Sequence, residues 1–299
     1  MTTSDLRTAP ALLRQLLGPT GVWTFRFEQL NPGQAADAAM EIERLGFPSV
    51  WFPEVGGTEA MALAGHLLHH TYSLTVANGI ARLTDRSAGA AAAAHRYLQT
   101  ISGGRHVLGL GLGGPLANGP SPVEIMAEYV DGVGQSWAEH RDHDGTPPVW
   151  FLAAYNERMT RLAAETTGAV HTYLIDPEHT AATRALVGEN PVIAAEMAVV
   201  LTDDRDEARA VGRAHVSRYL GGRSHQRKFA ALGFTEEDLA AGGSDRLVDR
   251  MVVHGADAIA ARVSEHRAAG ADHVAIQVLG TADLIEDLRA WALLADLVL

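Results

Sequence analysis

Hydrophobic and polar residues follow a regular rhythm along the chain from Gly21 onward. Short runs of β-branched, aromatic and aliphatic residues alternate with longer runs whose apolar positions have helical spacing. The eight short runs that we expect to be strands are 21–25, 49–52, 74–78, 106–110, 149–152, 169–173, 192–201 and 273–278. The helices that we expect between and after them include 34–45, 58–70, 87–101, 156–166 and 177–187.

This alternation predicts a parallel sheet, either closed into a barrel or open and doubly wound. Eight strand runs in 299 residues favour the (β/α)8 TIM barrel. An excess segment, about 203–270, lies between the seventh and eighth strands and reads as helices at 204–219, 235–241 and 256–269. It shows neither a strand pattern nor a linker. We therefore predict one α/β domain over 1–299, a TIM barrel with a helical insertion.

Composition removes several kinds of chemistry. The chain has no cysteine, which excludes disulfides, thiolate nucleophiles and iron–sulfur clusters. Its only lysine is Lys228, so a P-loop has no lysine where it needs one. The net charge of −12 disfavours nucleic-acid partners. No apolar run is long enough to span a membrane, and residues 1–10 lack a secretion signal. We expect a cytoplasmic protein.

A glycine-rich motif follows the fourth strand run. Residues 109–114 read GLGLGG and match the G-x-G-x-x-G pattern of dinucleotide-binding folds. The prolines Pro115 and Pro120 follow at once, so no helix opens there to hold a pyrophosphate. We expect no Rossmann site. Three histidines on one predicted helix, His66, His69 and His70, lack an H-E-x-x-H pattern, and we expect no metal site.

In TIM barrels the functional groups lie at the carboxyl ends of the strands. In this chain those ends carry Thr24, Phe25, Glu54, Asn78–Arg82, Gly111–Gly114, Ala153–Asn156, Thr172, Tyr173 and Gln277. Glu54 is the only carboxylate among them and follows an aromatic strand. Burial among apolar groups would raise its pKa and suit it to general acid catalysis. The alternative is a structural hydrogen bond to a neighbouring loop.

The fifth strand runs into a helix through small residues. Ala153 and Ala154 are followed by Tyr155 and by Asn156, a good helix N-cap. Free amides at a helix start form a ready anion site. Simple capping by Asn156 is the alternative.

Several motifs together resemble one enzyme family. The run 75–82 (TVANGIAR), the sequence SGGR at 102–105 and VLGLG at 107–111 resemble the bacterial luciferase-like flavin and deazaflavin oxidoreductases. The segments 173–180, 232–239, 243–248 and 269–274 are similar to the branch of that superfamily that depends on coenzyme F420. The resemblance extends from Gly21 to about Leu279, nearly the whole chain.

The resemblance implies a fold and a set of cofactor contacts. It implies a TIM barrel, often dimeric, with an insertion before the last strand and a bent third strand that backs the deazaflavin ring, in several members through a non-proline cis peptide. The implied cofactor-binding residues are Asn78, Gly79, Ile80, Gly111, Gly113, Ala153, Ala154, Tyr155 and Asn156. Val55 stands where some members have a histidine, and Gly113-Gly114 where relatives often have Ser-His.

We therefore expect an oxidoreductase that transfers a hydride between coenzyme F420 and a small organic substrate. Because members of the family are often dimeric, we expect a homodimer. Glu54 is the expected general acid. An FMN-dependent luciferase-like monooxygenase is the alternative enzyme on the same barrel. A non-catalytic cofactor-binding protein is the alternative from another class.

Overall fold

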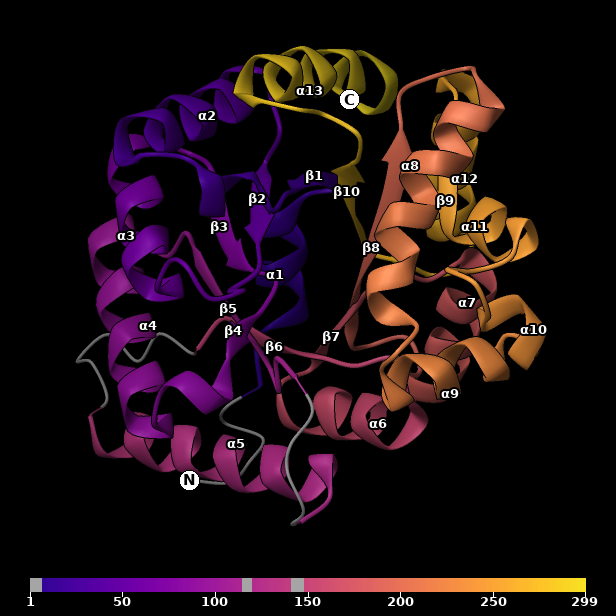
Figure 1. The fold of residues 1–299 in the computed structure, drawn as a ribbon. Helices are drawn as coiled ribbons and strands as arrows, with labels where there is room; N and C mark the ends of the chain where they lie inside the picture. Colours follow the sequence, from indigo (N-terminus) through magenta and orange to yellow (C-terminus); the bar gives the residue numbers. More distant parts are fainter. Residues whose placement is uncertain (1–6, 115–119, 141–147) are drawn as a thin grey trace.

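Eight parallel strands close into a barrel in the computed structural model, which describes residues 7–114, 120–140 and 148–299 (Figure 1). The barrel order is β10-β1-β2-β3-β5-β6-β7-β8, and β10 also pairs with β8 and so closes the ring. The predicted TIM barrel is confirmed. The strand bounds are β1 (Thr20–Trp23), β2 (Ser49–Phe52), β3 (Thr75–Asn78), β4 (Ala81–Arg82), β5 (His106–Gly111), β6 (Trp150–Ala153), β7 (Ala169–Thr172), β8 (Val192–Val200), β9 (Val252–His254) and β10 (His273–Val278).

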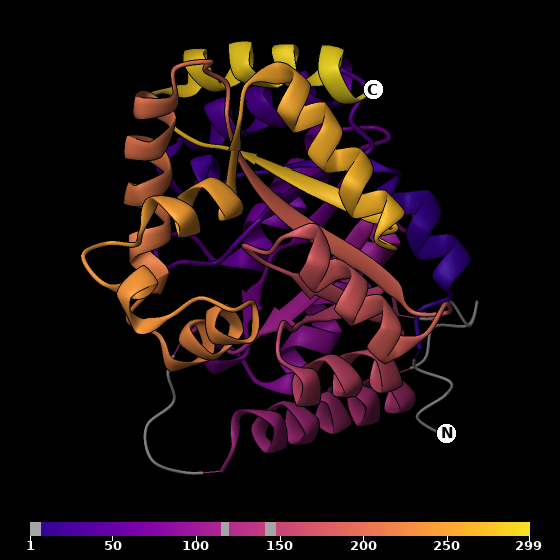
Figure 2. The same ribbon diagram turned by 90° about the vertical axis from the view of Figure 1, so that its right-hand side faces the viewer.

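Helices form a ring around this barrel, with α5 and α13 on opposite sides of it (Figure 2). The helix bounds are α1 (Pro10–Leu17), α2 (Pro32–Arg44), α3 (Ala60–His70), α4 (Ala88–Ser102), α5 (Pro122–Glu139), α6 (Glu157–Thr166), α7 (Pro177–Val187), α8 (Arg205–Val216), α9 (Arg223–Ala231), α10 (Glu236–Leu239), α11 (Asp245–Met251), α12 (Ala256–Ala268) and α13 (Leu284–Val298). Short 3-10 helices are η2 (Arg26–Gln29), η3 (Leu83–Asp85) and η4 (Ser217–Tyr219).

Successive strand residues face two different cores, as the two-residue period of a strand requires. On β2, Val50 and Phe52 pack outward against the helices. Trp51 points into the barrel, where its ring lies 4.7 Å from His171 and 5.3 Å from His273, stacked on both. Both faces of each strand are therefore buried, which is typical of parallel sheets covered by helices.

The amino-terminal helix α1 closes the end of the barrel at which the strands begin. Its side chains Leu13 and Leu17 belong to the same interior cluster as Trp51. The Ser49 hydroxyl donates a hydrogen bond of 3.0 Å to the carbonyl of Leu17 and ties the helix to β2. Because this end is filled, the open face of the barrel is the one at the carboxyl ends of the strands.

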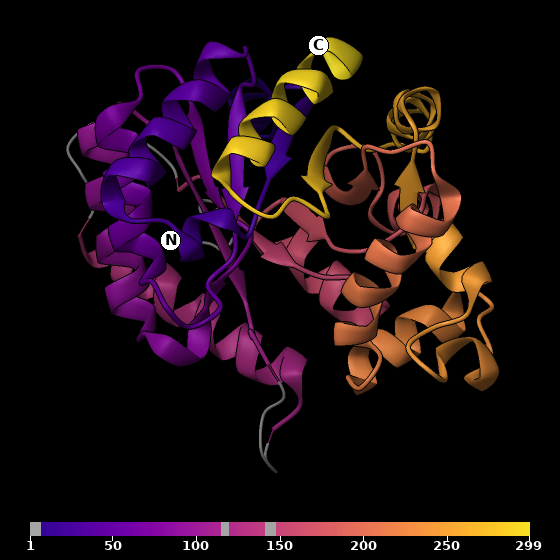
Figure 3. The same cartoon turned by 45° about the horizontal axis from the view of Figure 1, so that its top comes forward.

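The insertion between β8 and β10 stands on one side of the barrel as a group of helices (Figure 3). It contains α8 to α12, but it also contains the strand β9, so the expectation of a strand-free insertion is wrong. β8 has nine residues, and β7 pairs only with its first four positions, up to Ala195. Val252 and Val253 of β9 pair instead with Ala198 and Val199, so β9 covers an edge that would otherwise be unpaired.

Two of the sequence-based expectations concern segments outside the described residues. These are the first part of the N-terminal segment, 1–6, and the start of the loop after Gly114, 115–119. Within the ranges that the structure describes, no helix combines the length and apolarity that crossing a membrane requires.

Gly109, in the middle of β5, is required by close packing. A Cβ atom there would lie 1.9 Å from the carbonyl oxygen of Asn78 and 2.2 Å from the ring of Phe151. We expect Gly109→Ala to lower the melting temperature by about 5–10 °C, because overpacking a core costs roughly 3 kcal/mol. The matched control is Gly114→Ala, since nothing lies within 4 Å of that position. A Gly109→Ala protein as stable as the control would contradict the packing.

Candidate active site

The third strand bends where it reaches the open face of the barrel. The peptide bond between Gly79 and Ile80 is cis, at the position where the sequence predicted the bend. Two backbone hydrogen bonds fix the bend to the end of β2: Gly79 N–H donates to the Phe52 carbonyl at 2.7 Å, and Glu54 N–H donates to the Ile80 carbonyl at 2.9 Å. Ile80 is only partly buried and packs against the interior cluster.

Side chains of the protein itself occupy the space beside the glycines around this bend, where a Cβ atom would otherwise fit. A Cβ atom on Gly79 would lie 2.6 Å from the indole nitrogen of Trp23. Likewise, Ile80 occupies the space beside Gly111. The ring that approaches Gly79 is therefore a protein indole. At Gly113, whose φ is +73°, the Arg82 side chain fills the corresponding space.

A directed chain of hydrogen bonds holds Asn78, the residue before the bend. The Val149 N–H donates to His95 Nε2 at 3.3 Å, so the proton of neutral His95 must be on Nδ1. His95 Nδ1 lies 2.7 Å from His106 Nδ1, and His106 Nε2 lies 3.0 Å from Asn78 Oδ1. His95 therefore donates to His106, and His106 donates to Asn78.

His95 and His106 must both be neutral, because a second proton on either ring would place two hydrogen-bond donors against each other. Burial lowers the pKa of His106 to about 3. Burial, followed by the charge of His106, lowers the pKa of His95 well below its usual value. No sequence motif marks this series of hydrogen bonds, since His95 and His106 are eleven positions apart on different elements.

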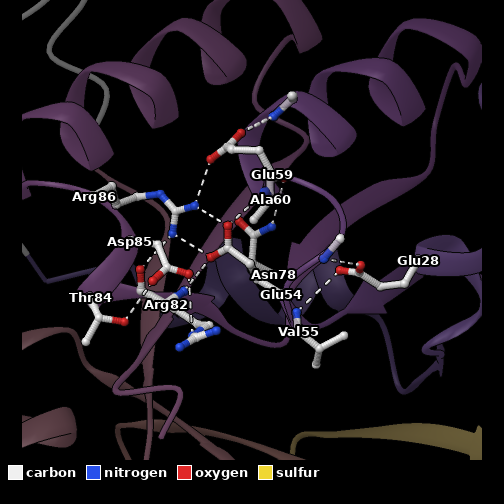
Figure 4. Close-up of polar contacts among 12 residues, drawn as sticks. Glu28, Glu54, Val55, Glu59, Ala60, Asn78, Arg82, Thr84, Asp85 and Arg86 are labelled. Carbon is white, nitrogen blue, oxygen red and sulfur yellow. Dashed lines mark hydrogen bonds and ion pairs between the residues drawn. The ribbon is translucent and has the colours of Figure 1, made fainter. Parts of the chain in front are cut away.

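The Glu54 carboxylate lies beside the bend and is held on both oxygens (Figure 4). It accepts hydrogen bonds from Ala60 N–H at 3.1 Å, Arg82 N–H at 2.7 Å and Arg86 Nη1 at 2.7 Å, and it also bonds Arg86 Nη2. Its side chain and that of Arg86 are 5% and 7% exposed. Arg86 in addition bonds Glu59 at 2.7 Å.

The expected raised pKa of Glu54 is wrong. Burial raises its pKa, but the hydrogen bonds from Arg86, Arg82 and Ala60 and the charge of Arg86 outweigh burial and lower it. A carboxyl that stays ionised is a poor proton donor. Its contacts match the alternative interpretation, a structural bond to a neighbouring loop, because they join α3 to the segment after β4.

The turn after β6 was expected to bind an anion. Asn156 does not cap α6 with its side chain; its Nδ2 donates to Ser224 Oγ of α9 at 2.9 Å instead. The first amides of α6 therefore have no side-chain cap. Ala153 is half-buried, but Ala154 belongs to the outer core, so the Ala154 side chain points away from the barrel mouth. The Tyr155 ring stacks on His225, 4.9 Å away.

The single lysine connects the insertion to the barrel. Lys228 of α9 is 1% exposed, and its Nζ donates to the carbonyls of Tyr173 at 3.0 Å and Leu174 at 2.7 Å. Glu196 accepts a hydrogen bond of 2.7 Å from Leu174 N–H. Burial lowers the pKa of Lys228 and raises the pKa of Glu196. The sequence marked Lys228 as the only lysine of the chain, but it did not indicate this burial.

A second polar group gathers at the mouth, around the hydroxyl of Tyr173. This hydroxyl donates to Gln277 Oε1 at 3.1 Å and lies 2.8 Å from the hydroxyl of Tyr219 and 3.4 Å from His215 Nε2. Tyr173 and Gln277 were among the expected strand-end residues, and the structure brings them together. His215 and Tyr219 come from the insertion, and no sequence motif marks them.

The mouth also contains polar atoms that lack a partner in the described part of the chain. Trp23 Nε1 and Thr172 Oγ1 are buried at the ends of β1 and β7 without a hydrogen bond. A flat ligand with polar edges would supply partners for them, and the uncapped start of α6 suits a phosphate. The residues present therefore fit a flat, phosphate-bearing cofactor. Ile80, Trp23 and Thr172 would hold its ring, and the α6 amides its phosphate.

Fold and site together define a TIM barrel with its ligand face at the carboxyl ends of the strands and a helical insertion over part of that face. The family model for luciferase-like monooxygenases matches residues 17–273. The chain belongs to this family, as the sequence motifs predicted.

Known proteins of three kinds are similar to the chain. A Mycobacterium tuberculosis protein, provisionally named a coenzyme F420-dependent oxidoreductase, is 25% identical over 87% of this chain and 94% of its own length. An F420-dependent secondary alcohol dehydrogenase, solved with an F420–acetone adduct, has a TM-score of 0.73 at 13% identity, covering 94% of this chain and 98% of the other. The FMN-bound oxygenating component of a Pseudomonas putida diketocamphane monooxygenase has a TM-score of 0.68 at 15% identity, with the same coverages. At these identities the two solved structures establish the fold.

We expect Glu54→Gln to destabilise the protein by about 3 kcal/mol, because it leaves the buried Arg86 guanidinium without its main counterion. Chemical denaturation measures this change. The matched control is Glu59→Gln, since Glu59 also bonds Arg86 but is 52% exposed, and its loss should cost less than about 1 kcal/mol. Unchanged stability combined with lost turnover in Glu54→Gln would return Glu54 to the role of general acid.

We expect the unfolding free energy to fall as the pH falls below 6.5. Burial lowers the pKa of eight histidines among the described residues: His95, His106, His171, His179, His215, His225, His266 and His273. The unfolded chain takes up protons from pH 6.5 downward while the folded chain does not, at up to about 1.4 kcal/mol per pH unit for each histidine.

Glu196 acts in the opposite direction, because its raised pKa gives the folded state an extra proton in this range, and it offsets one histidine. Denaturant unfolding at pH 7.5, 6.5 and 5.5 should show a loss of at least about 2 kcal/mol over the last step. Equal stability at pH 6.5 and 5.5 would mean that these histidines are accessible and titrate normally.

Proposed function

We propose that the protein is an oxidoreductase that uses coenzyme F420 to transfer a hydride to or from a small organic substrate. The observation that carries this proposal is the arrangement at the barrel mouth. The bend at Gly79–Ile80 follows β3 and the uncapped start of α6 follows β6, and only β5 lies between these two strands in the barrel. The family match and the name of the mycobacterial relative support the choice of cofactor.

The deazaflavin, when bound, supplies the hydride-carrying ring carbon. The residues of the chain hold and shape the site around it. Ile80 offers an apolar surface at the bend, and the hydrogen bonds through His106 fix Asn78 behind it. After β6, the α6 amides would hold the phosphate, and the Ser224 hydroxyl is held at this turn by Asn156. Glu54 in this proposal positions the loop after β4 and carries no proton.

Equilibrium titration of the purified protein with F420 and, in parallel, with FMN tests the cofactor. We expect F420 to bind at least about tenfold more tightly than FMN. Ala153→Asp should weaken F420 binding by at least about tenfold, because it places a carboxylate beside the phosphate site. The matched control is Ala261→Asp, which adds the same charge at an exposed position of α12.

Tighter binding of FMN would replace the proposal with the FMN-dependent monooxygenase. Unchanged F420 binding by Ala153→Asp would move the phosphate site elsewhere. Oxidation of reduced F420 in the presence of a substrate panel then separates an enzyme from a non-catalytic binding protein. Binding of F420 without turnover of any carbonyl compound or alcohol would overturn the proposal that the protein is an oxidoreductase.

A further inference from the structure

A cavity of about 360 Å³ opens between the barrel and the insertion, beside the polar group around Tyr173. Its walls are the ends of β1 and β10, the loops that follow them, and the α8–η4 segment. Figure 1 shows α8 beside β8. This volume is suited to a small organic molecule. The residues that decide its chemistry are Arg26, His215, Arg218, Gln277 and Asp287.

The cavity carries one uncompensated positive charge. Arg26 forms a buried ion pair with Asp287, whose side chain is 5% exposed, and the charges of the two cancel. Arg218 makes no hydrogen bond or ion pair with any residue in 7–114, 120–140 or 148–299. It is close enough that its charge contributes, after burial, to lowering the pKa of His215 to about 4. His215 is therefore neutral and adds no second charge. Although the chain as a whole has a net charge of −12, the local positive charge of the cavity favours an anionic ligand.

The cavity wall offers a free amide donor, that of Gln277. The single hydroxyl proton of Tyr173 goes to Gln277 Oε1, so Tyr219 and His215 donate to the Tyr173 oxygen. The oxygen of Gln277 is thus engaged, while its Nε2 has no partner among the described residues. Gln277 is 3% exposed and lines the cavity. Since this amide nitrogen is not among the fully buried atoms, it is open to the cavity, and a ligand oxygen there can accept from it.

We propose that this cavity is the substrate site and that it takes a small organic acid, whose carboxylate is bound by the guanidinium of Arg218 and the amide nitrogen of Gln277. That the ligand is a substrate rests on the proposed function. That the cavity prefers an anion rests on the residues of the cavity alone. The guanidinium comes from the insertion and the amide N–H from β10, and together they offer donors for the two oxygens of a carboxylate. A phosphate monoester shares this oxygen chemistry and is distinguished by the test.

The test uses pairs of probes that differ only in charge, with binding followed by ligand-observed NMR or calorimetry. Benzoate and benzamide form one pair and hexanoate and hexanamide another, with phenyl phosphate as the phosphate probe. We expect at least one carboxylate to bind about tenfold or more tightly than its amide. Arg218→Gln should abolish this preference. It should not change the melting temperature, because Arg218 has no partner to lose.

Arg289→Gln is the matched control, since it removes the same charge from an exposed arginine on α13, outside the cavity. It should keep the carboxylate preference. Equal binding of acids and amides by the unchanged protein, or a preference retained in Arg218→Gln, overturns the proposal. Tighter binding of phenyl phosphate than of benzoate overturns the carboxylate assignment.

Titration with F420 is run on the same variants to separate the two proposals. Arg218→Gln should bind F420 as the unchanged protein does, because the phosphate site lies at α6. If the unchanged protein does not bind F420, the proposed function is refuted. The acid–amide comparison still tests whether the cavity prefers an anion. Loss of F420 binding in Arg218→Gln alone would assign the cavity to the cofactor and overturn it as a substrate site.

Discussion

Closure of the barrel depends on β10, which pairs with β8 along all six of its residues and with β1 along four. The last strand is thus the neighbour of the first, and the ring of hydrogen bonds is complete only when the chain returns from the insertion. Both ends of the insertion are therefore fixed at neighbouring strands, β8 and β10. This constraint places Gln277 of β10 within reach of Tyr173 and of the insertion helix α8, and so creates the cavity between them.

The insertion is fixed to the barrel by a buried charge whose position is set by backbone groups. Lys228 loses its hydration, and two carbonyls after β7 and the nearby Glu196 offset part of that cost. Leu174, which offers one of these carbonyls, has a φ of +51°, a conformation uncommon for a leucine. With Lys228 in place, α9 brings Ser224 and His225 over the turn after β6. The same lysine therefore positions one wall of the proposed cofactor site.

The buried histidines inside the barrel and behind its strands are uncharged. His171 and His273 stack on Trp51, and His95 and His106 lie between α4 and β5. Each ring is held neutral by burial, which makes it a short, flat hydrogen-bonding group that packs like an aromatic residue. The bend at Gly79–Ile80 is thereby supported from behind by hydrogen bonds of fixed direction. The support of the bend and the expected sensitivity of the fold to acid therefore have one origin, the burial of neutral histidines.

The barrel strands and the family could be predicted from the sequence, because they depend on local hydrophobic period and on motifs such as 75–82 and 102–105 that are contiguous in the chain. It also located the bend at Gly79 and the turn at Ala153–Asn156. Tertiary structure alone decided what surrounds each of these residues. The ion pair of Glu54 with Arg86 reverses the pKa shift expected from an apolar neighbourhood. Likewise, the burial of Lys228, the strand β9 and the cavity beside Arg218 arise from contacts between segments far apart in the chain, which no local pattern encodes.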